Sequence, residues 1–155
     1  MVLQLAESPT PSSLSDKDTV AVRIPRERVG DVWHVLEAFV AKATAITKKT
    51  DIQTVSQAAA SGDVQLWAVM DTREENAKPI AAVVTELAKY PNGFKSCQVM
   101  LAGGGEMRRW KHLIATLEEF ARDEGCDTIE IVGRPGWGRL YPDYREIERW
   151  FEKEI

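Results

Sequence analysis

Cysteine is scarce in this sequence, with only Cys97 and Cys126 among 155 residues. Two thiols are too few for a disulfide framework or a cysteine-rich metal site, and their apolar surroundings favour buried free thiols. Long hydrophobic runs are also missing, since no apolar stretch reaches the roughly 20 residues that a membrane-spanning helix needs. The first residues have no basic segment followed by a long apolar one, so we expect no signal peptide. We therefore expect a cytoplasmic protein without a metal site or a membrane contact.

Positive charge is in deficit as well. The 24 acidic residues outnumber the 20 basic ones and give a formal net charge of −4. A nucleic-acid-binding domain usually carries a basic surface, so this balance argues against nucleic acid as a partner. Apolar residues make up 44% of the sequence and charged residues 28%. These values are typical of a globular domain, and the length suits a single hydrophobic core.

The first 18 residues differ in composition from the rest. The segment Ser8-Pro9-Thr10-Pro11-Ser12-Ser13 is rich in proline and serine. Such a segment buries too little apolar surface to offset the entropy that is lost on ordering. We predict a flexible arm over residues 1–18, which either stays free or binds a partner, followed by one domain over residues 19–155.

The hydropathy pattern predicts a mixed α/β fold. A two-residue alternation of apolar side chains marks the predicted strands, at residues 20–24, 64–70, 79–87, 94–101 and 128–132. A 3.6-residue period marks the predicted helices, at residues 32–43, 50–61 and 110–121. Short connections join the middle three strands, which predicts an antiparallel meander. The final strand–helix–strand unit makes the last strand parallel to the one before it.

Local signals refine two of these helices. Thr50 and Gln53 have the spacing of a capping box, which places the start of the second helix at Thr50. The third helix is predicted to pack on the sheet through side chains at helical spacing, namely Trp110, Leu113, Leu117 and Phe120. Arg109 and Lys111 lie on the opposite face and are expected to point to water.

A run of three glycines separates the fourth predicted strand from the helix that follows. The stretch reads Val99-Met100-Leu101-Ala102-Gly103-Gly104-Gly105-Glu106-Met107-Arg108-Arg109-Trp110. Together with the order of the elements over residues 19–150, it resembles the GNAT (GCN5-related N-acetyltransferase) superfamily. The resemblance implies a mostly antiparallel sheet flanked by helices with one parallel βαβ unit, acetyl-CoA as the cofactor and an amine as the substrate.

The resemblance assigns cofactor contacts to this stretch. In the family, the strand exposes backbone groups to the pantetheine arm, and the following loop and helix N-terminus hold the pyrophosphate. Free N–H groups and the positive end of a helix dipole attract phosphate, and glycine permits a close approach. The corresponding residues here are Met100, Leu101, Ala102, Gly103, Gly104, Gly105, Arg108 and Arg109.

Two residues depart from the family pattern. Trp110 stands where a glycine or alanine normally allows close approach, and the carboxylate of Glu106 would repel a phosphate. The phosphate loop is therefore degenerate if it binds the cofactor. The alternative is a glycine turn that only begins a core helix.

Tyr141 and Glu86 are the candidate catalytic residues. Tyr141 follows Leu140 in a stretch that resembles the late GNAT helix, whose tyrosine often protonates the departing thiolate of CoA. Glu86 lies in a central predicted strand, from which a carboxylate can act as general base on an amine. The alternatives are a core tyrosine with a satisfied hydroxyl and a surface glutamate.

A finer similarity rests on four short pieces, namely Leu66-Trp67, Thr85-Glu86, the glycine-rich loop that leads to Trp110, and Gly133-Arg134-Pro135-Gly136-Trp137. Their combination is similar to GNAT-like proteins of tailed bacteriophages and prophages, some of which are virion proteins without transferase activity. Two hypotheses follow. The first is an acetyl-CoA-dependent N-acetyltransferase in the host cytoplasm. The second is a non-catalytic virion protein that binds other virion proteins through its arm, and either could form a homo-oligomer.

Overall fold

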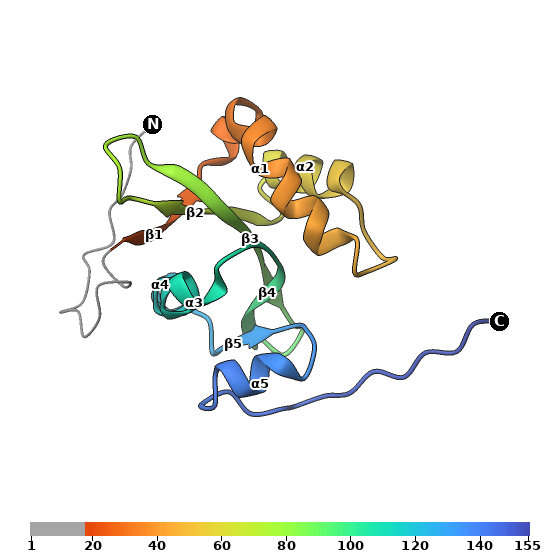
Figure 1. Ribbon diagram of the computed structural model, residues 1–155. Helices are drawn as coiled ribbons and strands as arrows, with labels where there is room; N and C mark the ends of the chain where they lie inside the picture. The colour runs from red at the N-terminus through yellow and green to blue at the C-terminus, as the bar shows by residue number, and fades with distance from the viewer. Residues whose placement is uncertain (1–17) are drawn as a thin grey trace.

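A five-stranded sheet forms the centre of the protein, whose computed structural model describes residues 18–155 (Figure 1). The strands are β1 (Thr19–Ile24), β2 (Gln65–Asp71), β3 (Lys78–Lys89), β4 (Lys95–Gly104) and β5 (Thr128–Ile131), in that order across the sheet. Neighbours from β1 to β4 are antiparallel, and β5 is parallel to β4. The predicted meander and the parallel last strand are both confirmed.

Helices cover both faces of the sheet (Figure 1). One face carries α1 (Val29–Thr44), which follows the short η2 (Arg26–Arg28), and α2 (Ile52–Ser61). The other face carries α3 (Met107–Trp110), η3 (Lys111–Leu113), α4 (Ile114–Asp123) and α5 (Gly136–Leu140). The mixed α/β fold with a mostly antiparallel sheet is therefore confirmed.

Alternation along the strands builds two cores. In β3, Ala82 and Val84 pack with the apolar stripe of α1, whereas Ala81 and Val83 pack with α4. Successive side chains of a strand point to opposite faces, so a strand covered on both sides buries consecutive residues. This explains why residues 81–85 of β3 are all buried.

The start of α2 differs from the prediction by one residue. Asp51 is the N-cap, and its side chain accepts a hydrogen bond of 2.8 Å from the Thr54 amide. The predicted pair Thr50 and Gln53 is therefore wrong, because the Asp51 carboxylate satisfies the free amide of the first turn. The helix ends at Ser61, and the C-cap after it is Gly62, whose φ of 87° is left-handed and therefore favours glycine.

The predicted continuous helix over residues 110–121 is wrong, because the chain leaves helical geometry at Trp110. The backbone there has φ −128° and ψ 1°, and the helix divides into α3, η3 and α4. The buried Trp110 indole donates from Nε1 to the Gly105 carbonyl at 2.8 Å. This hydrogen bond ties the Trp110 side chain to the loop before α3, and it accompanies the break in helical geometry at Trp110.

Arg109 does not face water as predicted, whereas Lys111 does. The Arg109 side chain is only 15% exposed, and its Nη1 lies 3.1 Å from Asp71 Oδ2 at the end of β2. The Arg109 carbonyl accepts a 2.8 Å hydrogen bond from the Thr19 hydroxyl. The spacing rule failed here because an ion pair to a neighbouring strand outweighed the solvation of the guanidinium.

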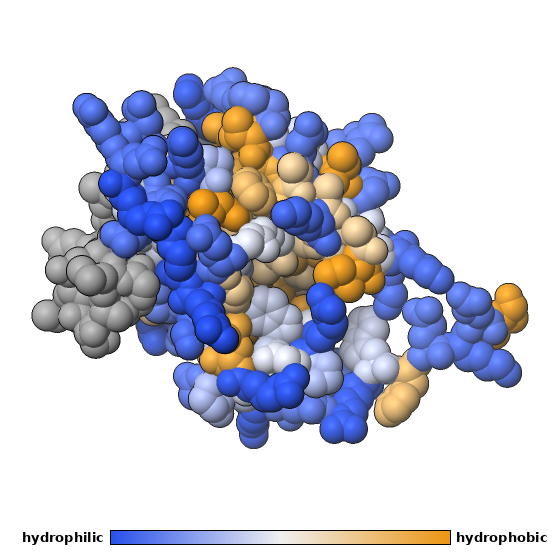
Figure 2. Space-filling model, viewed as in Figure 1, coloured by the Kyte–Doolittle hydropathy of each residue, from blue (hydrophilic) through white to orange (hydrophobic). Residues whose placement is uncertain are grey.

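The two ends of the chain contribute little to the cores. The predicted arm lies outside the described residues except for Asp18, whose carbonyl accepts a hydrogen bond from the Thr72 amide. After α5 the chain extends away from the body, and Figure 2 shows apolar atoms on this projecting segment. Trp150 and Phe151 are both highly exposed there. No helix in residues 18–155 is long and apolar enough to cross a membrane.

Leu117→Ala tests the packing of α4 on the sheet. Leu117 is 6% exposed and belongs to the core between α4 and β3. We expect a loss of about 2–5 kcal/mol in the free energy of unfolding, because truncation leaves a cavity. Urea denaturation measures this loss, and Glu119→Ala on the exposed face of the same helix is the control. Equal stabilities for the two variants would show that this face of α4 is not in the core.

Candidate functional site

The sheet opens between β4 and β5. Their pairing runs from Ser96–Thr128 to Val99–Ile131 and closes with a 3.0 Å hydrogen bond from the Val132 amide to the Val99 carbonyl. β4 continues to Gly104 beside β3. Within residues 18–155, the side of β4 that faces away from β3 has no strand partner beyond this point. We call this place the split.

A bulge in β4 lies at the beginning of the split. The register with β3 shifts so that Thr85 pairs with Val99 and Val84 pairs with Leu101. Met100 is therefore the extra residue, without a partner in β3. A bulge bends the strand and redirects the backbone groups beside it. The strand thus changes direction where it loses β5 as its neighbour.

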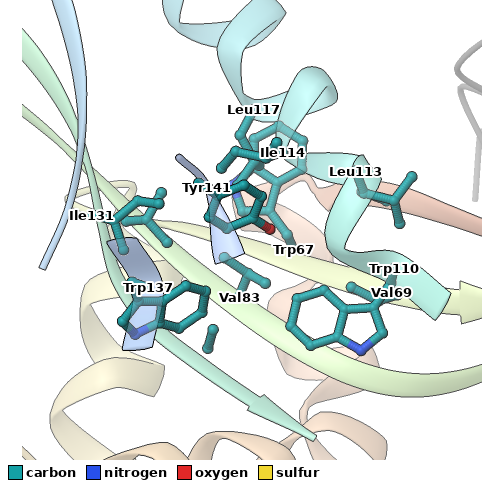
Figure 3. A pocket seen from close by; sticks show the side chains of 13 residues that line it. Trp67, Val69, Val83, Trp110, Leu113, Ile114, Leu117, Ile131, Trp137 and Tyr141 are labelled. Atoms are coloured by element: carbon teal, nitrogen blue, oxygen red, sulfur yellow. The ribbon is translucent and has the colours of Figure 1, made fainter. Parts of the chain in front are cut away.

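An apolar pocket lies under the split on the α4 face (Figure 3). Val99, Ala102 and Ile131 line it beside the split, and the helical side contributes Trp110 and Trp137 together with Tyr141. Figure 3 shows both indoles directed toward the space between the sheet and the helices. These rings leave a cavity of only about 30 Å³. Sequence reasoning missed Trp137 as a member of this site, although its neighbours Gly133 and Gly136 marked an unusual turn.

Tyr141 is buried, with 8% of its surface exposed. Its hydroxyl donates a 2.7 Å hydrogen bond to the Lys111 carbonyl, and its ring stacks on Trp137 at 6.2 Å between centroids. Burial, with a smaller contribution from the charge of Glu118, raises the pKa of Tyr141 to about 12. The phenol therefore stays protonated at neutral pH.

Glu86 lies on the opposite face of the sheet from Tyr141. Thr85 and Leu87 face the α4 side, where Thr85 accepts a hydrogen bond from the Trp67 indole, so Glu86 between them faces the α1 side. The structure therefore does not bring the two predicted catalytic residues to one face. Glu86 pairs in register with Gln98, the residue before Val99, and so lies within one position of the split.

Sequence reasoning missed two polar residues beside Glu86. Gln98 and Glu130 are partners in register, and the Gln98 amide donates to Glu130 Oε2 at 3.1 Å. With Glu86 they form a row across β3, β4 and β5. An open hollow of about 470 Å³ adjoins this row, lined by Tyr90, Pro91, Asn92, Phe94 and Glu130. No local motif marks these residues, because only the strand register brings them together.

Close packing explains why two of the three positions in the predicted phosphate loop are glycine. A Cβ on Gly103 would lie 2.0 Å from the Phe39 carbonyl oxygen of α1. Gly104 has a φ of +143°, and a Cβ there would lie 2.5 Å from the Ile80 carbonyl oxygen. A Cβ on Gly105 would meet nothing within 4 Å. The glycine run therefore lets β4 pass closely beside α1 and β3, and only Gly105 has no such explanation.

The loop after the glycines is held by charge. Glu106 has left-handed backbone angles, φ 56° and ψ 38°, and its carboxylate lies 3.1 Å from Arg109 Nη1. Arg109 also binds Asp71, and hydrogen bonds from Arg73 and Arg109 hold the pKa of the Asp71 carboxyl well below its usual range. Arg109 is thus committed to two carboxylates, whereas Arg108 is exposed.

The cysteines are free thiols, as predicted. Cys97 is buried in β4, and this burial raises its pKa to about 11. No group of three or more histidine, cysteine, aspartate and glutamate side chains within residues 18–155 is placed to hold a metal ion.

The alkaline stability of the protein tests the burial of Tyr141. Its pKa is raised to about 12 in the folded chain, compared with about 10 when unfolded. The folded state holds the proton more tightly, so this contribution to stability is complete below about pH 10 and is lost as the pH rises through the folded pKa. We expect the stability difference between the wild type and Tyr141→Phe to shrink over that window. Urea titrations at a series of pH values measure it, and a constant difference would contradict the burial.

Solved structures share this arrangement of sheet and helices. An aminoglycoside acetyltransferase from an uncultured soil metagenomic sample matches with a TM-score of 0.63 and 16% identity, over 88% of this chain and 98% of that one. A predicted acetyltransferase from Clostridium acetobutylicum, solved with acetyl-CoA, matches with a TM-score of 0.59 and 12% identity, over 88% of this chain and 96% of that one. A GNAT family acetyltransferase from Staphylococcus aureus matches with a TM-score of 0.56 and 13% identity, over 89% of this chain and 99% of that one.

No protein-family model matches this chain, and no curated protein matches it. None of the three structures is described as a phage protein, so that finer similarity stays a prediction. At these identities the likeness establishes the fold and leaves the activity to be argued from the site. This protein has the fold of the GNAT acetyltransferases.

Proposed function

We propose that this protein binds acetyl-CoA at the split and transfers the acetyl group to an amine. The observation that carries this proposal is the parting of β4 from β5 at Val99 and Ile131, with an apolar pocket directly beneath it. An unpaired strand edge offers backbone donors and acceptors to an amide-bearing chain, and an apolar pocket suits its methylene groups. The structural likeness to an acetyltransferase that was solved with acetyl-CoA supports the same ligand.

The cofactor contacts divide between the strand and the loop. The backbone of Met100, Leu101 and Ala102 would hold the pantetheine arm, because this part of β4 lies beyond the last pair with β5. Gly105 and Arg108 are the loop residues best suited to the phosphates, since a Cβ on Gly105 would meet nothing within 4 Å and Arg108 is exposed. Gly103, Gly104 and Arg109 support the loop from behind, through α1, β3 and Asp71.

The proposed chemistry uses groups from both faces of the sheet. Glu86 would take a proton from the amine on the α1 face as the nitrogen attacks the thioester carbonyl. The new C–N bond forms as the C–S bond breaks, and Tyr141 would give its proton to the departing sulfur. The raised pKa of Tyr141 keeps the phenol protonated at neutral pH. Its hydroxyl now donates to the Lys111 carbonyl, so it would have to turn from that carbonyl toward the sulfur to deliver the proton.

The second hypothesis, a non-catalytic virion protein, rests on the finer similarity to phage proteins and on the arm. The arm lies outside the described residues, and no feature of residues 18–155 favours that function over acetyl transfer. Acetyl transfer is therefore the proposal that the site supports best.

Calorimetry with acetyl-CoA and a thiol-release assay with primary amines test the proposal. We expect a Kd below about 10 μM, equivalent to roughly −7 kcal/mol. Tyr141→Phe should lower kcat at least tenfold with little change in Kd, because the thiolate loses its acid. Glu86→Gln should remove the acidic limb of the pH profile of kcat/KM, because the general base is gone.

Glu119→Gln, on the exposed face of α4, is the matched control for Glu86→Gln and should keep wild-type kinetics. Absence of both binding heat and thiol release would overturn the proposal. Binding without thiol release from any amine would keep the cofactor site and reject the transferase.

A further inference from the structure

Trp137 occupies the space that the proposed cofactor would need. Its indole lines the apolar pocket and stacks on Tyr141 with an interplanar angle of 7°. The cavity that remains is about 30 Å³, room for roughly two or three water molecules. A pantetheine arm cannot enter unless one of the rings that line the pocket moves.

The Trp137 indole packs directly against Gly133. A Cβ on Gly133 would lie 2.4 Å from both Cδ1 and Nε1 of Trp137. Any larger residue at this position would force the ring away, because the atoms in conflict belong to the indole and not to the backbone. The cavity of about 30 Å³ is too small to receive an indole, so the displaced ring would have to leave the pocket.

Three indoles line the pocket, and they differ in how firmly they are held. Trp67 is 4% exposed, and its Nε1 donates to the Thr85 hydroxyl. Trp110 is 6% exposed, and its Nε1 is bound to the Gly105 carbonyl. Trp137 is only partly buried and stands on α5, a helix of five residues that contains Gly136 and Gly138. Glycine raises the conformational freedom of the backbone, and so short a helix has few internal hydrogen bonds. Trp137 is therefore the ring that can move.

We propose that Trp137 is a gate that closes the pocket in the free protein and leaves it when acetyl-CoA binds. This inference rests on the proposed function, since the gate has meaning only if the pocket receives the cofactor. The closed state reduces the apparent affinity by the fraction of molecules in which the pocket is open. Trp137 thus sets the affinity for the cofactor without contributing to the chemistry.

Two substitutions open the gate by different means. Trp137→Ala removes the ring, and Gly133→Ala pushes it out by adding one methyl group. We expect each variant to lower the Kd for acetyl-CoA at least tenfold in calorimetry, which corresponds to about 1.4 kcal/mol. Gly136→Ala is the control for the glycine substitution, because a Cβ there meets nothing within 4 Å. Trp150→Ala, at an exposed indole, is the control for the loss of a tryptophan.

Fluorine NMR of protein labelled with 5-fluorotryptophan follows the ring directly, with the resonance of residue 137 assigned by Trp137→Phe. We expect this resonance to move in Gly133→Ala without ligand, and to move in the same direction when acetyl-CoA binds the wild type.

Tight binding by the wild type, with an unchanged resonance and no gain in either variant, would overturn the gate and leave the proposed function standing. Absence of binding by the wild type and by both opened variants would overturn the proposed function, and the gate with it.

Discussion

The short pairing between β4 and β5 is the constraint on which the site depends. It begins at Ser96–Thr128 and ends at Val99–Ile131, although β4 continues to Gly104. β5 stops because the chain turns into Gly133 and Pro135, which lead into α5. A longer β5 would pair with the free edge of β4 and close the split. The same turn places Trp137 and Tyr141 beside the pocket. The turn after β5 therefore opens the sheet and also positions two of the residues that line the opening.

The opposite wall of the pocket depends on an ion pair. Asp71 at the end of β2 binds Arg109, and this contact joins the loop after β4 to the far side of the sheet. Arg109 is mostly buried, so the pair is shielded from solvent on the side of the loop. Each charge also has a second partner, because Arg109 contacts Glu106 and Asp71 contacts Arg73. Trp110 follows directly, and its hydrogen bond to Gly105 completes a loop that is held at both ends.

The sequence predicts the architecture well because its signals are periodic. Alternation in Val20, Val22 and Ile24 locates β1, and the short connections around β3 specify the antiparallel order. The positions that failed depend on contacts between distant residues. Arg109 is predicted to face water by helical spacing, but Asp71 lies 38 residues earlier and binds it. Trp110 is buried in the core, as its place in the apolar stripe predicts, but the stripe gives no sign of the break in the helix at this residue.

The site itself could be predicted only in part. The stretch from Met100 to Gly105 and the position of Tyr141 follow from a family pattern, and the structure places both at the split. The pattern gives no sign that Gly103 and Gly104 are required for packing, because the atoms that need the space belong to α1 and β3. Nor does it bring Gln98 and Glu130 beside Glu86, which only the strand register does.

Amide hydrogen exchange with and without acetyl-CoA tests most directly whether the split is the binding place. The unpaired edge of β4 should exchange faster than the paired strands in the free protein. With acetyl-CoA present, the amides of residues 100–105 should become protected, while those of β1 and β2 stay unchanged. Protection confined to another part of the chain, with residues 100–105 unaffected by the ligand, would contradict the account.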